Sequence, residues 1–213
     1  MSDSSLVADR VEIRDLRNHV GEEVTLAGWC YNSRGSKNVK FLILRDGGGQ
    51  VQCVFGAGSS ENGAFERFDE ITQESSLSVR GVVVEHPKKP GVYELDARDF
   101  TLIQQAVDYP ISPKEHGIDF LFDRRHLHLR SSRPWNIIRV RHRIIKAIRD
   151  YFDSHGFTLL DSPILTANAG EGTSNLFSTE YFDLGHAYLA QTGQLYGEAG
   201  AMAFGKVYTF GPT

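Results

Sequence analysis

Apolar and polar residues alternate along much of the first hundred positions of the chain. A period of two is typical of β-strands with one face buried and one face in water. Glycine and proline lie between the alternating runs and indicate turns. The pattern predicts five strands, at Val24–Tyr31, Val39–Asp46, Gln50–Phe55, Leu77–Val84 and Tyr93–Ile103. It also predicts a short helix or turn over 11–20 and a short helix over 64–73.

Five strands with a helix after the third are typical of the OB-fold, a small Greek-key barrel. Another small β-barrel or a β-sandwich is the alternative. On the second strand both faces are apolar, so Phe41 is left outside if Leu42 and Leu44 point in. Gln52 and Glu94 lie on the outward faces of their strands. An outward aromatic ring can stack on a nucleic-acid base, and the neighbouring amide and carboxylate can hydrogen-bond to the edge of that base. The alternative is that the preceding loop covers the ring.

Helical spacing replaces the alternation in the second half of the chain. Proline and glycine between 106 and 117 indicate a linker. Ser131 or Ser132 can cap a long helix that ends at Gly156. A second helix, Gln194–Phe204, is rich in small residues, which suits either a pocket wall or tight core packing. The fold class is therefore α+β, with a barrel domain at 1–105, a linker at 106–130 and a second domain at 131–213.

Composition narrows the class of protein further. The 213 residues are 40% hydrophobic and 23% charged, which is ordinary for a globular chain, and the net charge of −4 argues against a generally basic nucleic-acid binder. The strongest basic segment, 124–149, suits a solvated helix face, and a minority of its cations suit phosphate contacts. Two cysteines without metal-type spacing indicate a reducing cytoplasm and no metal site. We expect no signal peptide and no membrane span.

The segments AQTGQLYGEA and AFGKVYTFGPT resemble the catalytic domain of the asparaginyl-tRNA synthetases. These are class II enzymes of the subgroup that also includes the aspartyl and lysyl synthetases. In that family, the strand ending in FGPT leads into the Arg and Glu of motif 2. The resemblance therefore implies the front part of an incomplete antiparallel-sheet catalytic domain. It places the catalytic residues after Thr213, so we expect the 213-residue chain alone to be inactive.

The segment GWCYNSRGSKNVKFLILRDGGGQVQCVF is similar to the anticodon-binding domain of the same subgroup. By this resemblance, Phe41 stacks on the middle anticodon base, a uridine, and Gln52 contacts the edge of that base. Arg34 contacts the anticodon backbone or bases. Glu94 lies where the family uses an acidic residue near the anticodon, although YELD is a short pattern.

The long helix, HGFTLLDSPIL and Pro163 resemble class II motif 1, which builds the dimer interface. A plain amphipathic helix packed on its own domain is the alternative. The Gly-rich loop at 169–174 lacks the Gly-Lys-Ser/Thr end of a phosphate loop. In the family, the matching loop closes over the bound amino acid. Glu171, with Ser174 near it, is the candidate for holding the amino group, although by itself the segment is only a flexible loop with one acid.

The remaining amino-acid contacts lie around the second helix. The resemblance assigns substrate-backbone contacts to Gln191, Thr192 and Gln194. Aspartyl enzymes carry a Lys three residues after the last of these, where this chain has Gly197. The next residue, Glu198, can accept bonds from the amide of asparagine and repel the carboxylate of aspartate. The alternative is an ordinary acid on the helix surface.

The resemblance implies an asparagine–tRNA ligase that uses ATP and Mg²⁺, binds tRNA(Asn) and L-asparagine, and forms a homodimer. Positioning and charge neutralisation carry such phosphoryl-transfer chemistry, and no covalent enzyme nucleophile is needed. Two other functions remain open. One is an aspartyl-tRNA synthetase of relaxed specificity. The other is a non-catalytic module that binds tRNA or single-stranded RNA through the barrel.

Overall fold

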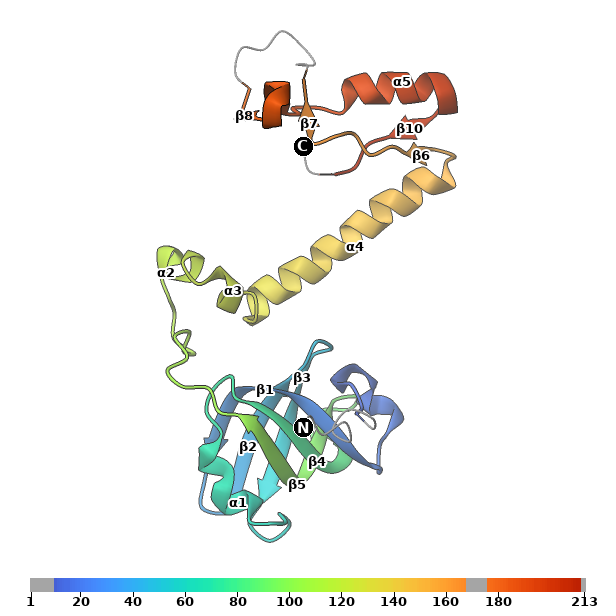
Figure 1. Cartoon of the computed structure of the whole chain (residues 1–213). Helices are drawn as coiled ribbons and strands as arrows, with labels where there is room; N and C mark the ends of the chain where they lie inside the picture. The colour runs from blue at the N-terminus through green and yellow to red at the C-terminus, as the bar shows by residue number, and fades with distance from the viewer. Residues whose placement is uncertain (1–9, 168–175, 212–213) are drawn as a thin grey trace. The chain divides into compact units, whose positions relative to one another are not determined.

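The computed structural model describes residues 10–167 and 176–211 (Figure 1). The chain divides into two compact units, Met1–Glu115 and His116–Thr213. None of the described helices has the length and apolar character needed to cross a bilayer.

The first unit contains the five strands that the alternation predicts. All five are confirmed, and the first reaches four residues further than expected. The strands are β1 (Glu23–Gly35), β2 (Val39–Arg45), β3 (Gln50–Gly56), β4 (Ser76–Glu85) and β5 (Tyr93–Gln104). A 3₁₀ helix, Ile13–Asn18, precedes them. The helix expected over 64–73 is shorter: α1 (Ala64–Arg67) passes directly into a 3₁₀ turn at Phe68–Glu70, where Phe68 and Ile71 are both buried.

The five strands close into a barrel in the order β1-β2-β3-β5-β4. The β3–β5 pair is parallel, and the other strand pairs of the barrel are antiparallel. This closed five-stranded barrel, with a helix after β3, confirms the OB-fold. The side chains that the alternation predicts to point in do so, since Leu42 and Leu44 are fully buried; Cys53 is fully buried as well.

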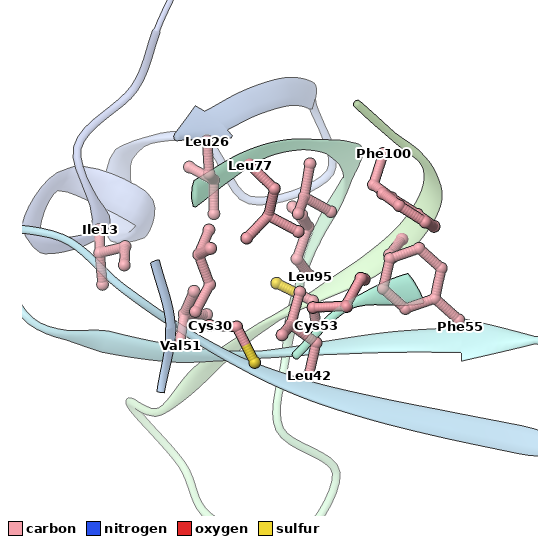
Figure 2. Packing of buried hydrophobic residues seen from close by; sticks show 14 of the residues in the cluster. Ile13, Leu26, Cys30, Leu42, Val51, Cys53, Phe55, Leu77, Leu95 and Phe100 are labelled. Atoms are coloured by element: carbon pink, nitrogen blue, oxygen red, sulfur yellow. The ribbon is translucent and has the colours of Figure 1, made fainter. Parts of the chain in front are cut away.

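Aliphatic, aromatic and thiol side chains fill the barrel interior (Figure 2). Phe55 makes edge contacts with the rings of Phe68 and Phe100, at centroid distances of 5.4 and 6.0 Å. Cys30 and Cys53 are both buried as free thiols. Burial raises the pKa of Cys30 to about 12, and it raises the pKa of Cys53 as well. Both thiols therefore act as small apolar side chains of the core.

A buried ion pair joins β2 to the loop before β4. Both carboxylate oxygens of Glu74 accept hydrogen bonds from one guanidinium nitrogen of Arg45, at 3.0 and 2.8 Å. The Glu74 side chain is only 4% exposed, and that of Arg45 is 12% exposed. The guanidinium also lies 5.3 Å from the ring centre of Trp29 on β1. Removing either charge would leave the other buried and uncompensated.

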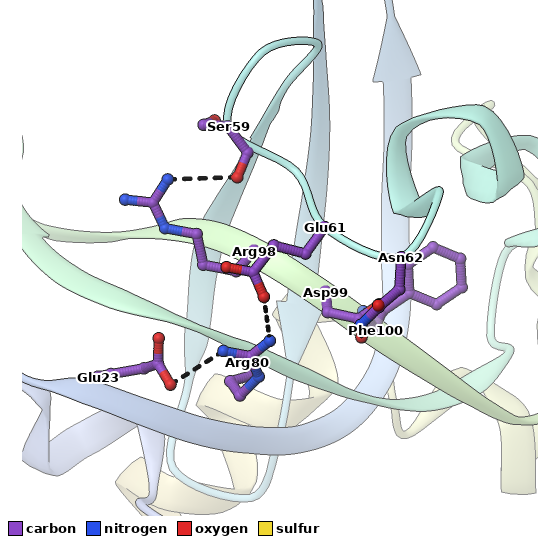
Figure 3. Close-up of polar contacts among 8 residues, drawn as sticks. All are labelled: Glu23, Ser59, Glu61, Asn62, Arg80, Arg98, Asp99 and Phe100. Carbon is purple, nitrogen blue, oxygen red and sulfur yellow. Dashed lines mark hydrogen bonds and ion pairs between the residues drawn. The ribbon is translucent and has the colours of Figure 1, made fainter.

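A second ion-pair network lies on the barrel surface (Figure 3). Arg80 on β4 binds Glu61 in the loop after β3 and Glu23 on β1. These two carboxylates raise the pKa of Arg80, with Glu61 contributing most. The side chains are one-third to one-half exposed, so solvent screens the network far more than the buried pair.

The barrel unit continues beyond its last strand. The carbonyl of Ala106 accepts a hydrogen bond from Thr72 Oγ1, and the carbonyl of Ile111 accepts one from Gln73 Nε2. Ile111 is itself buried. The first part of the predicted linker is thus attached to the barrel, while the domain boundaries that we expected remain a prediction.

The second unit begins with two short helices, α2 (Ile118–Phe122) and α3 (Arg125–His128), followed by the long helix α4 (Ser132–Ser154). Ser131 occupies the capping position of α4, but its side chain makes no capping hydrogen bond. Gly156 ends the helix with a φ of +76°, a conformation that favours glycine. The elements that follow are β6 (Thr158–Leu159), β7 (Leu165–Thr166), β8 (Ser178–Glu180), the 3₁₀ turn Phe182–Leu184, β9 (His186–Leu189), α5 (Gln194–Phe204) and β10 (Val207–Tyr208).

Two small sheets accompany the helices of this unit. β7, β9 and β8 form an antiparallel sheet, whereas β10 and β6 form a parallel pair. The α5 helix has the predicted bounds, and β10 is only two residues long. Tyr208 stacks on Phe152 of α4, at a centroid distance of 4.7 Å, and its hydroxyl donates to Asp153. These contacts fix β10 against the end of α4.

The apolar face of α4 is largely uncovered in the second unit. Its exposed side chains are Ile137, Ile138, Val140, Ile144 and Tyr151. A plain amphipathic helix packed on its own domain would bury such a face. The described part of the unit therefore presents a surface of the kind that docks against further protein.

Candidate functional site

The register of the barrel gathers the predicted RNA-contacting residues on one outer surface. Arg34 of β1 lies opposite Phe41 of β2, and Gln52 of β3 lies opposite Glu94 of β5. Ile43 joins the two pairs, because it is two residues from Phe41 and pairs with Gln52. The outward positions of four neighbouring strands thus form one face, which we call the outer face.

Phe41 is half-buried, and the group over its ring is Arg34. The guanidinium carbon lies 5.0 Å from the ring centre. Arg34 belongs to β1, which extends to Gly35, and not to the segment after a strand that ends at Tyr31, as the alternation predicted. A base that stacks on this side of the ring must first displace a cation whose contact is worth about 0.5–1 kcal/mol at an exposed site.

The carboxylate of Glu94 lies at the centre of a polar row on the outer face. Glu94 is only 9% exposed, although alternation predicts an outward position. It is covered because Gln52 Nε2 donates to its Oε1 at 2.7 Å, and His86 Nε2 lies 3.7 Å from the same oxygen. His86 was not among the residues that the sequence indicated. His86 directly follows β4. The last residue of β4 pairs with Tyr93, the neighbour of Glu94, so the strand pairing is the signal that places His86 near Glu94.

The predicted amino-acid contacts gather at the start of α5. The hydroxyl of Thr192 accepts a hydrogen bond from the backbone N–H of Gln194, at 3.2 Å. Gln194 Nε2 in turn donates to Glu198 Oε1 one helical turn later, at 2.8 Å. Gln191 precedes them and is exposed. The structure therefore brings these residues into one short, solvent-facing segment.

Two glycines of α5 differ in their surroundings. A Cβ at Gly200 would lie 2.5 Å from Leu160 Cδ2, so this face of the helix packs directly on the segment after β6. A Cβ at Gly197 would meet no atom within 4 Å. Tight packing therefore accounts for Gly200, while Gly197, where aspartyl enzymes carry a lysine, faces open space beside Glu198.

Three further residues were predicted at this site or at the dimer interface. Pro163 is exposed, in the connection between β6 and β7. Glu171 and Ser174 lie outside the described residues. Within 10–167 and 176–211, no group of three or more His, Cys, Asp or Glu side chains is arranged to hold a metal ion.

Two family models match the chain. The model for class II tRNA synthetases of the D, K and N type matches residues 117–213. The model for the OB-fold nucleic acid binding domain matches residues 24–103. The two matches fall on the two compact units described above.

Curated relatives with the name asparagine–tRNA ligase match nearly the whole chain. The protein from Sorangium cellulosum is 56% identical over 200 residues, which are 93% of this chain and 45% of the relative. The protein from Thermus thermophilus is 49% identical over 205 residues, covering 96% of this chain and 47% of the relative. The chain thus spans about half the length of the curated relatives it matches.

Solved structures show the same relationship. The asparaginyl-tRNA synthetase of Pyrococcus horikoshii, complexed with asparaginyl-adenylate, aligns with a TM-score of 0.87 and 32% identity. The alignment covers 97% of this chain and 48% of that one. The family models, the relatives and the solved structure agree: the second unit, over 117–213, belongs to the class II tRNA synthetases of the D, K and N type, and the barrel, over 24–103, is an OB-fold nucleic acid binding domain.

Proposed function

We propose that this chain serves an asparagine–tRNA ligase as its anticodon-binding barrel and the first part of its catalytic domain. The ligase activates L-asparagine with ATP and transfers it to tRNA(Asn). The observation that carries the proposal is the outer face, where an aromatic ring, an amide and a carboxylate lie together on a closed OB barrel. The names of the relatives favour asparagine among the substrates of the group.

The barrel binds the anticodon by stacking and by hydrogen bonds to base edges. Phe41 supplies the stacking surface after Arg34 swings away, and Arg34 is then available for the RNA backbone. Gln52 contacts the middle base, a uridine. Glu94 holds Gln52 and contacts the anticodon itself. Such recognition requires an unstacked single-stranded loop, and an anticodon provides one.

The segment 191–198 binds the amino acid. Gln191, Thr192 and Gln194 contact its backbone, and Glu198 receives the side-chain amide. Glu171 and Ser174 close over the amino group, which excludes water and strengthens the charge contacts. Because the position of Gly197 offers no cation to the β-carboxylate of aspartate, the site favours asparagine.

ATP supplies the adenylyl group in this reaction, and Mg²⁺ neutralises the phosphate charges. The proposal assigns the contacts with both groups to the part of the ligase that follows this sequence in the family. Pro163 and the apolar face of α4 suit a homodimer interface. A cytoplasmic location follows from the proposal, because tRNA is charged where translation takes place.

Binding of tRNA(Asn) by this chain tests the proposal. We expect the chain to bind the tRNA(Asn) transcript more tightly than the same transcript with its three anticodon bases replaced, at one fixed salt concentration. Equal affinity for the two transcripts would contradict anticodon recognition. Binding of any uridine-containing single strand as tightly as the tRNA would instead support the general RNA-binding module.

Glu198 distinguishes the asparagine ligase from an aspartyl enzyme of relaxed specificity. In a ligase that contains this sequence, Glu198→Gln should reduce the ratio of kcat/KM for asparagine over aspartate, because the repulsion of the aspartate carboxylate is lost. Amino-acid-dependent pyrophosphate exchange measures both values. Gln194→Ala is the comparison variant: it removes a contact to the backbone that both amino acids share and keeps the charge of Glu198, so it should lower both values without changing their ratio. An unchanged ratio in the glutamine variant would remove Glu198 from the specificity site.

A further inference from the structure

The orientation of the Gln52 carboxamide follows from its contact with Glu94. An ionised carboxylate only accepts hydrogen bonds, so the Gln52 atom that faces Glu94 Oε1 at 2.7 Å must be the amide nitrogen. The carbonyl oxygen Oε1 of Gln52 then lies on the opposite side of the planar amide. A base edge that approaches from that side meets an acceptor.

This polarity distinguishes the two pyrimidines. Uracil carries a donor, N3–H, at the middle of its Watson–Crick edge, whereas neutral cytosine has a bare acceptor nitrogen there. An outward Oε1 therefore accepts from uridine and is unfavourable opposite cytidine. A half-turn of the same amide would present the NH₂ group and reverse the preference. Discrimination at this position thus depends on what prevents the amide from turning.

The Glu94 carboxylate prevents this turn, and His86 is placed to hold that carboxylate. Its Nδ1 accepts a hydrogen bond from the backbone N–H of Lys88 at 3.0 Å, so the proton of the neutral ring resides on Nε2. That nitrogen faces Glu94 Oε1 at 3.7 Å, longer than a hydrogen bond but with its N–H group nearest the carboxylate. The turn that carries His86 is itself closed, because the N–H of His86 donates to the carbonyl of Val92 at 2.7 Å.

We propose that His86 is a positioning residue for base discrimination on the outer face. Its imidazole holds the Glu94 carboxylate in place, the carboxylate fixes the Gln52 amide, and the fixed amide selects uridine over cytidine. The inference rests on the proposed anticodon binding and names a residue through which that binding becomes specific. His86 itself does not contact the RNA in this arrangement.

Two RNA hairpins test the inference. Both carry the anticodon loop of tRNA(Asn), and they differ only in having uridine or cytidine at the middle anticodon position. We expect the unmodified chain to prefer the uridine hairpin about tenfold, the size of one base-edge contact. The variant H86F keeps a ring of similar size but loses both nitrogens. It should bring the ratio of the two dissociation constants to within about twofold, because the Glu94 carboxylate, no longer held by the imidazole, can move away from Gln52 and release the amide.

Three controls separate positioning from other effects. H86Q restores an N–H toward Glu94 and should recover most of the preference. K88A removes a charge from the same turn but not the backbone donor, so it should weaken both hairpins equally and preserve the ratio. H86A serves as a second loss variant if H86F melts at a lower temperature, with the same expected ratio.

The outcomes discriminate between this inference and the function on which it rests. If the unmodified chain prefers the uridine hairpin and both H86F and H86A keep that preference, the role of His86 is refuted while anticodon binding stands. If the unmodified chain binds neither hairpin, anticodon binding itself is refuted, and this inference with it. Loss of the preference in H86F with recovery in H86Q establishes the positioning role.

Discussion

Truncation of Phe41 is the most direct test of the outer face. Phe41 lies outside the buried core cluster, so Phe41→Ala should leave the barrel folded. One base stacked on an aromatic ring contributes about 1–3 kcal/mol to binding. The base must displace Arg34, whose contact with the ring is worth about 0.5–1 kcal/mol. The net loss on truncation is therefore about 0.5–2 kcal/mol, or about 2- to 30-fold in the dissociation constant for tRNA(Asn).

Fluorescence anisotropy with labelled tRNA at one fixed salt concentration measures this loss. Val54→Ala is the matched control, because Val54 pairs with Phe41 on the neighbouring strand and shares its outward face. It should change the affinity little. Repeating Phe41→Ala in an Arg34→Ala background should give a larger loss than in the native background, because no cation has to be displaced. An unchanged dissociation constant in the single variant would refute stacking on Phe41.

Three further predictions concern stability and are checked by urea unfolding. Glu74→Ala should destabilise the chain by about 3–5 kcal/mol, because it leaves a buried guanidinium without its partner charge. Glu61→Ala, on the exposed network, should cost about 1 kcal/mol or less. Equal costs would contradict the difference in burial. Gly200→Ala should cost about 1–3 kcal/mol through overpacking, while Gly197→Ala should be neutral or stabilising by up to about 1 kcal/mol. Burial in the folded barrel raises the pKa of the Cys30 thiol to about 12, whereas an unfolded thiol ionises near about 8.5. Between these pH values the unfolded chain therefore binds fewer protons than the folded chain. Stability should therefore fall as pH rises from about 8.5 toward 12, and Cys30→Ala should flatten that fall; an identical slope in the variant would refute it.

The barrel was predictable because its signal is local. Period-two alternation and glycine-rich turns depend only on neighbouring residues, and they predicted the five strands and the inward positions of Leu42 and Leu44. The capping of α4 was less predictable. Ser131 is of a suitable type and in a suitable place, yet its hydroxyl makes no capping bond, because residue type alone does not determine where a side chain points.

The details of the outer face depend on register, which composition does not reveal. Alternation places Glu94 outside, but only strand pairing brings Gln52 and His86 beside it and covers it. In the same way, the contact between Arg34 and Phe41 requires β1 to continue past its predicted end so that the two residues pair. Long-range pairing thus decided the chemistry of the site, while local pattern decided which strands carry it.

The strand order of the barrel also bears on how the chain folds as it leaves the ribosome. Two seams close the barrel, β1 with β4 and β3 with β5, and each joins segments that are far apart in sequence. Contacts of such separation make folding slow, on a scale of about milliseconds to seconds. Since β5 ends at Gln104, every strand of the barrel is available before α4 has been synthesised. The barrel can therefore complete its fold while translation of the second unit continues, and the apolar face of α4 emerges after the barrel has closed, when no open sheet edge of the barrel is left to capture it.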